Sequence, residues 1–297
     1  MKVVRSPGII LAFIIGLTVL SAQLDAAYPL VLRERMERGQ LAHILLIGSD
    51  ARPGEEQTRS DTIILLSIDA VSNQVALVSI PRDTRVHFQG KDSKINMVNQ
   101  IKGPAALCSE VGKLLNIAVD HYVVTDFSGF EEIIDLFGGV WMDVDISVYS
   151  YRQGVVLEKG WQHLSGKEAL AYARFRANPD MDIGRVQRQQ RLLTALARQM
   201  LEADNIARIP QLIPSFKEHV KTNLTLGDMF YLAQQFRQLK EGNIITQTLP
   251  GYHYFAPYSG ASYWEVDRNT ARVLLPGLFA GQRFETYCPA PPGVNQG

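Results

Sequence analysis

Residues 42–69 read AHILLIGSDARPGEEQTRSDTIILLSID, and residues 75–80 add VALVSI. The stretch contains three short runs rich in Ile, Leu and Val, at 42–48, 62–68 and 75–80. Runs of this length and composition, bounded by Gly, Asn and Pro, are typical of buried strands. The sequence therefore predicts strands at the start of the fold, with polar loops over 49–60 and 81–99.

Helical patterns occupy much of the remaining chain. Two Ser residues are each followed by a Glu at capping-box spacing: Ser128 with Glu131 and Ser165 with Glu168. A further strand is expected over 140–146. Helices are expected over 130–137, 169–175, 182–203, 205–219, 226–240 and 267–279. Strands that alternate with helices predict an α/β sandwich around a largely buried sheet.

The overall composition excludes some classes of function. Thirty Lys and Arg residues balance thirty Asp and Glu residues. The whole molecule therefore offers no strong field for nucleic acid or for an anionic membrane surface. An anion site must instead be a local concentration of Arg and Lys.

The chain has two cysteines, Cys108 and Cys288, which form no CxxC motif or Cys/His cluster. Their spacing excludes a structural zinc site of the usual kind. A single disulfide and two separate thiols both remain open, and the separate thiols are favoured.

The N-terminus predicts a membrane anchor. Residues 6–24 carry no charged side chain, and Lys2 and Arg5 precede them. As a helix this segment spans about 28 Å, close to the hydrocarbon core of a bilayer. Basic residues before it place the N-terminus inside and the following domain outside. A cleaved signal peptide is the alternative, and it is disfavoured because Leu20 and Leu24 stand where a cleavage site needs a small residue.

Two aspartates flank the first polar loop. Asp50 follows the first predicted strand, and Asp61 directly precedes the second. Carboxylates without nearby His or Cys suit a hard cation such as Mg²⁺. The equally weighted alternative is structural: Asp61 caps a turn and Asp50 pairs with Arg52.

Cationic residues gather in two further places. Arg82 ends the third predicted strand, and Lys94 follows it; both types bind phosphate oxygens. Arg185, Arg188 and Gln189 share one face of a predicted helix, at i, i+3 and i+4. A solvated surface is the alternative, but the apolar stripe that continues the helix indicates that it is packed. Together with the carboxylates, these residues predict a metal-assisted site for phosphate ester chemistry.

The chain resembles the LytR-CpsA-Psr family of cell-wall phosphotransferases. Seven motifs between residues 41 and 200 occur in the family's order and spacing: GSDAR, RSDT, VSIPRDT, KIN, DFSGFEEIIDLFGGV, LSGKEALAYARFR and DIGRVQRQ. The resemblance implies an α-β-α sandwich with a central mixed β-sheet on one N-terminal transmembrane helix. It also implies a long apolar pocket for a polyprenyl chain, with Mg²⁺, or Mn²⁺ instead, at the pyrophosphate.

Family roles carry over onto particular residues of this sequence. Asp50 and Asp61 become metal-site carboxylates. The expected pyrophosphate-binding residues are Arg52, Arg82, Lys94, Arg174, Arg176, Arg185, Arg188 and Gln189. Asp61 is the expected base, and Arg82 and Arg185 are expected to act with it in catalysis.

The implied reaction begins with a hydroxyl of peptidoglycan attacking the phosphoryl group next to a glycopolymer. The bond between the two phosphates of the polyprenyl-pyrophosphate carrier breaks, and polyprenyl phosphate is the leaving group. Two alternatives remain: a polyprenyl-phosphate-binding regulator without transfer activity, and a simple lipid pyrophosphatase. The apolar helix face from Phe127 to Phe137 fits a lipid pocket, but a stripe of this kind is more often core.

The expected organisation is a single-pass protein of the cell membrane with an extracytoplasmic domain. Residues 1–5 are the cytoplasmic N-terminus, and 6–24 form the signal anchor. A connector follows over 25–40, the catalytic domain over 41–288 and a flexible tail over 289–297. The expected partners are the lipid-linked glycan, peptidoglycan and membrane lipid, but not nucleic acid.

Overall fold

The computed structural model describes residues 32–49, 59–150, 154–175, 182–200, 203–237, 239–257, 259–292 and 294. At its centre is a six-stranded sheet with the order β11-β6-β1-β2-β3-β12. Its strands are β1 (Ala42–Ser49), β2 (Ser60–Asp69), β3 (Gln74–Ser79), β6 (His121–Thr125), β11 (Lys221–Thr222) and β12 (Ile244–Thr248). The three strands predicted at the start of the fold are β1, β2 and β3.

The strand directions bring the ends of four strands together at one edge of this sheet. β1 runs parallel to β6, β3 runs parallel to β12, and β2 is antiparallel to both β1 and β3. The ends of β1, β3, β6 and β12 therefore meet the start of β2 at the same edge. We call it the C-terminal edge.

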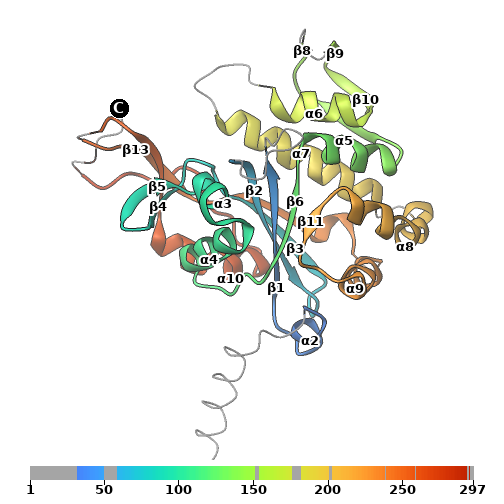
Figure 1. Ribbon diagram of the computed structural model, residues 1–297, viewed down its shortest axis with the longest axis horizontal. Helices are drawn as coiled ribbons and strands as arrows, with labels where there is room; N and C mark the ends of the chain where they lie inside the picture. The colour runs from blue at the N-terminus through green and yellow to red at the C-terminus, as the bar shows by residue number, and fades with distance from the viewer. Residues whose placement is uncertain are drawn as a thin grey trace, which may run out of the picture.

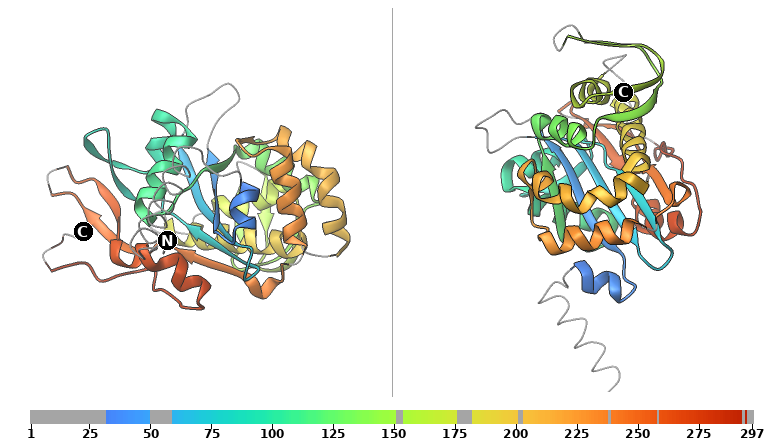
Figure 2. Two further views of the ribbon diagram at one scale, coloured as in Figure 1. Left: turned by 90° about the horizontal axis from the view of Figure 1, so that it is seen from below. Right: turned by 90° about the vertical axis from the view of Figure 1, so that its right-hand side faces the viewer.

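Helices cover both faces of the sheet (Figure 2). On one face lie α3 (Asn96–Lys102), α4 (Pro104–Leu115) and α10 (Arg268–Phe279), and on the other lie α2 (Leu32–Glu37), α8 (Ala203–Glu218) and α9 (Leu226–Phe236). The predicted α-β-α sandwich with a central mixed sheet is confirmed.

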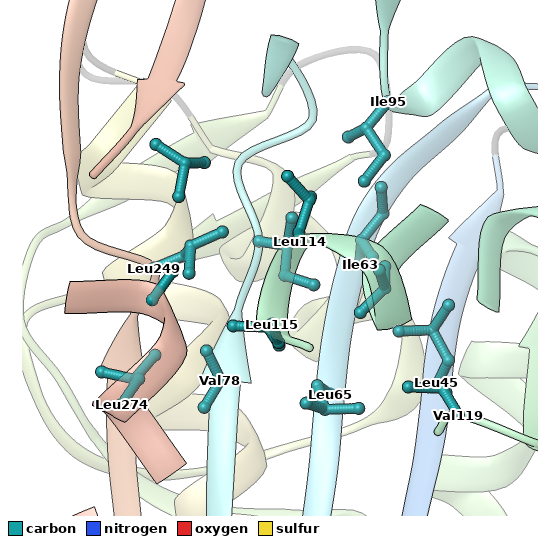
Figure 3. Close-up of a cluster of buried hydrophobic side chains, with 14 of the residues drawn as sticks. Leu45, Ile63, Leu65, Val78, Ile95, Leu114, Leu115, Val119, Leu249 and Leu274 are labelled. Atoms are coloured by element: carbon teal, nitrogen blue, oxygen red, sulfur yellow. The ribbon is translucent and has the colours of Figure 1, made fainter. Parts of the chain in front are cut away.

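The strands alternate between the two layers. Leu45, Ile63 and Leu65 lie in one buried cluster with Leu115 of α4 and Leu274 of α10 (Figure 3). All five side chains are 3% exposed or less. Since burying one such side chain stabilises a fold by about 1.5–3 kcal/mol, this cluster fixes the position of the sheet and thereby of its edges.

A third apolar cluster lies beyond the C-terminal edge (Figure 1). It is built from α5 (Phe127–Leu136), α6 (Gly166–Arg174), α7 (Asp182–Met200) and two hairpins, β7 (Val140–Val144) with β10 (Gly160–Leu164) and β8 (Val148–Ser150) with β9 (Val155–Leu157). Phe130 and Ile134 of α5 and its C-cap residue Phe137 pack into it. The core interpretation of that helix face is confirmed for these three residues.

Two of the differences between the structure and the sequence prediction have a clear local cause. The expected loop over 81–99 contains a hairpin, β4 (Arg85–Phe88) with β5 (Lys91–Lys94), because Gln89 and Gly90 both take a positive φ, as a type I′ turn requires. The N-cap of α5 is Asp126, whose side chain accepts a hydrogen bond from Gly129 N, so the prediction of a cap at Ser128 was wrong. The Ser165 capping box of α6 is confirmed.

After β12 the chain forms a hairpin of β13 (Gly251–Phe255) with β14 (Ser262–Val266), and Trp264 and Val266 of β14 are buried in the cluster that contains Leu274. A short 3-10 helix, η1 (Glu241–Asn243), directly precedes β12. Cys108 and Cys288 are both free thiols, as favoured from the sequence.

The predicted anchor over 6–24 lies outside the described residues. Within the part of the chain that the structure describes, no helix combines the length and the apolar character that crossing a bilayer requires. In the expected connector, residues Leu32–Glu37 form α2, and its Leu32 and Met36 are buried against the sheet layer.

Candidate active site

The C-terminal edge of the sheet is a row of hydroxyl groups. Five of its six strands begin or end there with Ser or Thr: Ser49, Ser60, Ser79, Thr125 and Thr248. All except Thr125 are at most 6% exposed. The apolar sheet thus ends in closely spaced polar groups, on which charged side chains from the neighbouring loops converge.

Asp61 and Arg82 form the centre of this edge. Asp61 is the second residue of β2, and Arg82 follows β3 after a short turn. Arg82 Nη1 donates a hydrogen bond to Asp61 Oδ1 at 2.8 Å, and both side chains are about a quarter exposed. The structure therefore brings together two residues that sequence reasoning had placed in the same site from different motifs.

The backbone pairs the two residues that directly precede the predicted metal ligands. Ser49 pairs with Ser60 across β1 and β2, so the residues that directly precede Asp50 and Asp61 are neighbours. Asp50 itself, like Arg52, lies outside the described residues. Asp61 is described, and its partly exposed carboxylate lies at the C-terminal edge of the sheet.

The turn that carries Arg82 is held by its own hydrogen bonds. Thr84 N and Oγ1 both donate to Pro81 O, at 2.9 and 2.7 Å, and Asn96 N donates to Arg82 O. Asp83 pairs with Lys94, with Nζ 2.9 Å from Oδ1. Asp83 thus holds Lys94 beside the turn, while Arg82 pairs with Asp61.

Helix α7 crosses the C-terminal edge of the sheet (Figure 1). Gln190 fixes it there, because its Nε2 donates to Ser79 Oγ at 3.0 Å and to Thr248 Oγ1 at 3.3 Å. Sequence reasoning missed Gln190 because a single amide on a helix carries no signal of its contacts. Its neighbours Arg185 and Arg188 are 5% and 6% exposed, so the cationic end of α7 is packed, as predicted.

Arg174 and Arg188 both make contacts at the end of α6. Arg188 Nη2 donates to Phe175 O at 2.6 Å, directly after Arg174. The Arg174 guanidinium lies over the ring of Phe127, 3.9 Å from its centroid. Phe127 begins α5 just beyond β6, so this contact holds Arg174 near the same edge of the sheet. Arg176 lies outside the described residues, and Gln189 is half-buried on α7.

A cleft of about 950 Å³ opens at the same edge. Its lining includes Ser49 and Thr125 at the strand ends, Gly103 between α3 and α4, and Lys102 and Lys221. The cleft is large enough for part of a substrate, and its lining is mixed rather than purely apolar.

The described residues contain no group of three or more His, Cys, Asp or Glu side chains that could hold a metal by themselves. A Mg²⁺ site does not require one, because this ion is usually held by one or two carboxylates together with substrate phosphate oxygens and water. Asp61 at the polar strand edge fits that donor set. Together with the nearby Arg and Lys side chains, Asp61 forms a charged site that suits a phosphate ester.

Comparisons with known proteins identify the family of the chain. The model of the LytR_cpsA_psr family matches residues 25–276. "Regulatory protein MsrR" of Staphylococcus aureus (strain COL) is 32% identical over 238 residues, which cover 78% of this chain and 72% of MsrR. TagV of Bacillus subtilis (strain 168), named as a polyisoprenyl-teichoic acid–peptidoglycan teichoic acid transferase, is 33% identical over 235 residues, which cover 75% of this chain and 60% of TagV.

The fold comparison gives the same answer. The crystal structure of B. subtilis TagV matches with a TM-score of 0.71 and 31% identity, and the match covers 83% of this chain and 99% of the TagV chain. The family match over residues 25–276 and the fold match to TagV thus agree. The chain belongs to the LytR_cpsA_psr family.

Proposed function

We propose that this protein transfers a glycopolymer phosphate from a polyprenyl-pyrophosphate carrier to a hydroxyl of peptidoglycan and releases polyprenyl phosphate. The observation that carries the proposal is the Asp61–Arg82 pair at a sheet edge crossed by the helix that bears Arg185 and Arg188. The name of TagV, a teichoic acid transferase, supports the same class of reaction.

The buried arginines of α7 point to an anionic ligand. Arg188 is 6% exposed, and its Nε is buried without a hydrogen-bond partner among the described residues. Burying a guanidinium is costly unless its charge and donors are satisfied. A pyrophosphate would supply both the opposite charge and the acceptor oxygens, and the planar fork of Arg suits them.

The chemistry follows from where the charges lie. Arg82, Arg174, Arg185 and Arg188 would stabilise the negative charge on the transferred phosphoryl oxygens and on the departing polyprenyl phosphate. Asp61 would accept the proton of the attacking hydroxyl. Since Arg82 already bonds Asp61, a phosphate oxygen bound by Arg82 comes close to that carboxylate.

Asp61 together with Asp50 would hold Mg²⁺, or Mn²⁺, which would neutralise pyrophosphate charge when bound. Lys94 and Gln189 complete the proposed pyrophosphate site, along with Arg52 and Arg176. The site belongs outside the membrane, on a single-pass protein whose segment 6–24 is the anchor, because a lipid-linked substrate must be met at the bilayer surface.

A second candidate is a lipid-binding regulator that performs no transfer, and the name of MsrR, a regulatory protein, favours it. One assay separates the candidates. The purified chain is supplied with a lipid-linked pyrophosphate sugar, Mg²⁺ and peptidoglycan, and both polyprenyl phosphate and wall-linked glycan are measured. Transfer supports the proposal, and tight lipid binding without turnover supports the regulator. Release of polyprenyl phosphate with water alone as acceptor would instead indicate a pyrophosphatase.

A further inference from the structure

Two tryptophan rings lie exposed and parallel on the hairpin of β7 and β10. Trp141 is 51% exposed and Trp161 is 69% exposed. Their ring centroids are 6.4 Å apart with an interplanar angle of 16°. Trp is highly buried in most proteins, so a pair of this kind on the surface calls for a ligand.

The strand pairing extends the pair into a row of three rings. His163 is the register partner of Trp141, and their centroids are 5.0 Å apart. Alternation along β7 buries Val140, Met142 and Val144 while Trp141 and Asp143 face outward. The row is therefore the outward face of a hairpin whose inward face is anchored in the core.

Trp141 and Trp161, but not His163, line one side of a groove of about 650 Å³. The opposite wall is the outer face of α7, which contributes amide, guanidinium and hydroxyl groups from Gln187, Arg191, Thr194 and Arg198. Gln187 to Arg198 spans about 16 Å of helix. The Trp rings thus face a row of hydrogen-bonding side chains along α7. This combination suits a sugar chain rather than a lipid.

The groove is held open by its own backbone contacts. Trp141 N donates to Gln199 Oε1 at 3.0 Å, and Gln199 Nε2 donates to Gly139 O at 2.8 Å. His163 Nε2 lies 2.8 Å from Gly138 O. The two bonds of Gln199 fix β7 to α7, so the two walls keep their spacing without a ligand.

We propose that this groove binds a glycan chain, whose pyranose rings stack on Trp141 and Trp161 while their hydroxyl groups bond the side chains of α7. The apolar face of a pyranose ring buries its C–H groups on an aromatic ring, and the ring edge carries the hydroxyls. A protein partner would also use exposed Trp residues, but an elongated groove with donors along one side fits a polymer of hydroxylated rings better.

The groove leads towards the proposed active site, and in that respect the inference rests on the proposed function. Gln187 stands in the same helical turn as Arg185 and Arg188, about 100° around the helix from Arg188. Gln190 lines the groove and also bonds the strand ends Ser79 and Thr248. A glycan in the groove therefore reaches the helix end that bears the phosphate-binding arginines.

Tryptophan fluorescence tests the groove directly. The chain has three Trp residues, and the third, Trp264, is 3% exposed. Acrylamide quenching of the full-length protein thus reports almost entirely on Trp141 and Trp161. We expect peptide-free glycan strands from peptidoglycan, or glycopolymer released from the wall, to protect these rings from acrylamide. The probe that protects identifies the glycan as acceptor or donor.

Substitutions provide the second measurement. Trp141→Ala and Trp161→Ala should each weaken glycan binding about ten-fold, whereas Trp161→Phe, which keeps a ring, should weaken it less. In the transfer assay the loss should appear as a raised KM for the glycan. Phe230→Ala, at a 41% exposed aromatic residue on α9, is the matched control and should change neither binding nor KM.

The outcomes separate this inference from the proposed function. If the wild-type protein transfers glycan but neither probe protects the rings and both Ala variants keep the wild-type KM, the groove proposal is wrong while the transferase proposal stands. If no transfer occurs but glycan still protects the rings, the groove proposal stands alone. Capture of a protein by a photo-cross-linker at position 161, without glycan protection, would make the surface a protein-docking site and overturn the inference.

Discussion

Arg82 Nη1 lies 2.8 Å from Asp61 Oδ1, so a cation expected to bind phosphate and a carboxylate expected to act as base are already ion-paired in the protein alone. Both side chains are about a quarter exposed. Pairs of this exposure contribute little to stability, with a median of about 0–1 kcal/mol. The position of the pair at the polar sheet edge is therefore better explained by chemistry than by folding.

Asp61→Asn and Arg82→Gln should each lower the transfer rate about 100-fold or more, because each removes a charge that acts on the phosphoryl group or on the attacking hydroxyl. The free energy of unfolding should change by less than about 1 kcal/mol. Radiolabelled transfer and urea denaturation measure the two effects. Arg33→Gln, in the exposed Arg33–Glu37 pair of α2, is the control for loss of an ion pair and should leave the rate unchanged.

Arg188→Met tests whether the buried guanidinium serves a ligand. Met fills a similar volume and removes the buried charge, while Phe175 O loses its hydrogen bond. The lost hydrogen bond lowers the stability and the removed buried charge raises it. The free energy of unfolding should therefore stay within about 1 kcal/mol of wild type. Transfer should fall about 100-fold. A variant that is strongly destabilised would show instead that Arg188 has a structural role. Arg272→Met on the exposed face of α10 is the matched control.

Much of the fold could be predicted from local sequence. The apolar runs of β1, β2 and β3 and the capping box of α6 are signals contained within a few residues. The cap of α5 was misassigned because Asp126 and Ser128 stand close together and both residue types favour N-caps, so their competition is decided by the backbone. The hairpin of β4 and β5 was missed because its strands are short and polar and its turn begins with Gln89.

The candidate site was predictable in its residue types but not in its contacts. Asp61 and Arg82 come from different strands, and only the register of β2 and β3 shows that they meet. The stacking of Arg174 on Phe127 joins residues far apart in the chain, and no periodic pattern records it. The sequence contains a weak signal for the exposed Trp pair. In the strand 140–144, apolar residues alternate with Trp141 and Asp143, so Trp141 falls on the same side as the charged Asp143.

Removal of divalent metal should abolish transfer while leaving the fold intact. The proposed ion is held by carboxylates and by the substrate's own phosphate oxygens, so the fold of the protein without substrate should not depend on it. EDTA should stop the release of polyprenyl phosphate, and added Mg²⁺ should restore it. Asp61→Asn should require a higher Mg²⁺ concentration for its residual activity. Undiminished transfer in EDTA would exclude the metal-assisted mechanism.

The stability of the protein should fall between about pH 6.5 and pH 4 through His43. Burial on β1 lowers the pKa of His43 from 6.5 to about 4. Below pH 6.5 the unfolded chain binds a proton at this residue that the folded protein does not bind until about pH 4, so acidification favours unfolding. The full effect is roughly 3 kcal/mol.

Urea denaturation of wild type and His43→Leu at several pH values checks this. Burial also lowers the pKa of His121, so both proteins should lose some stability on acidification. The free energy of unfolding of wild type minus that of His43→Leu isolates His43. This value should fall as the pH falls through this window. A difference that stays constant with pH would contradict the prediction.

Gly166→Ala should destabilise the protein by about 2 kcal/mol, through the contact between α5 and α6. A Cβ at Gly166 would lie 2.1 Å from the backbone oxygen of Glu131, and a backbone atom cannot move aside as a flexible side chain can. Gly166 N also donates to Asp135 Oδ1 at 2.7 Å, so the first turn of α6 is tied to α5. Because α6 ends at Arg174, a shift of this helix should lower transfer as well as stability. Gly242→Ala in η1, where a Cβ meets nothing within 4 Å, is the matched control and should change neither. Equal denaturation midpoints for the two variants would show that the close packing of α5 on α6 does not position the site.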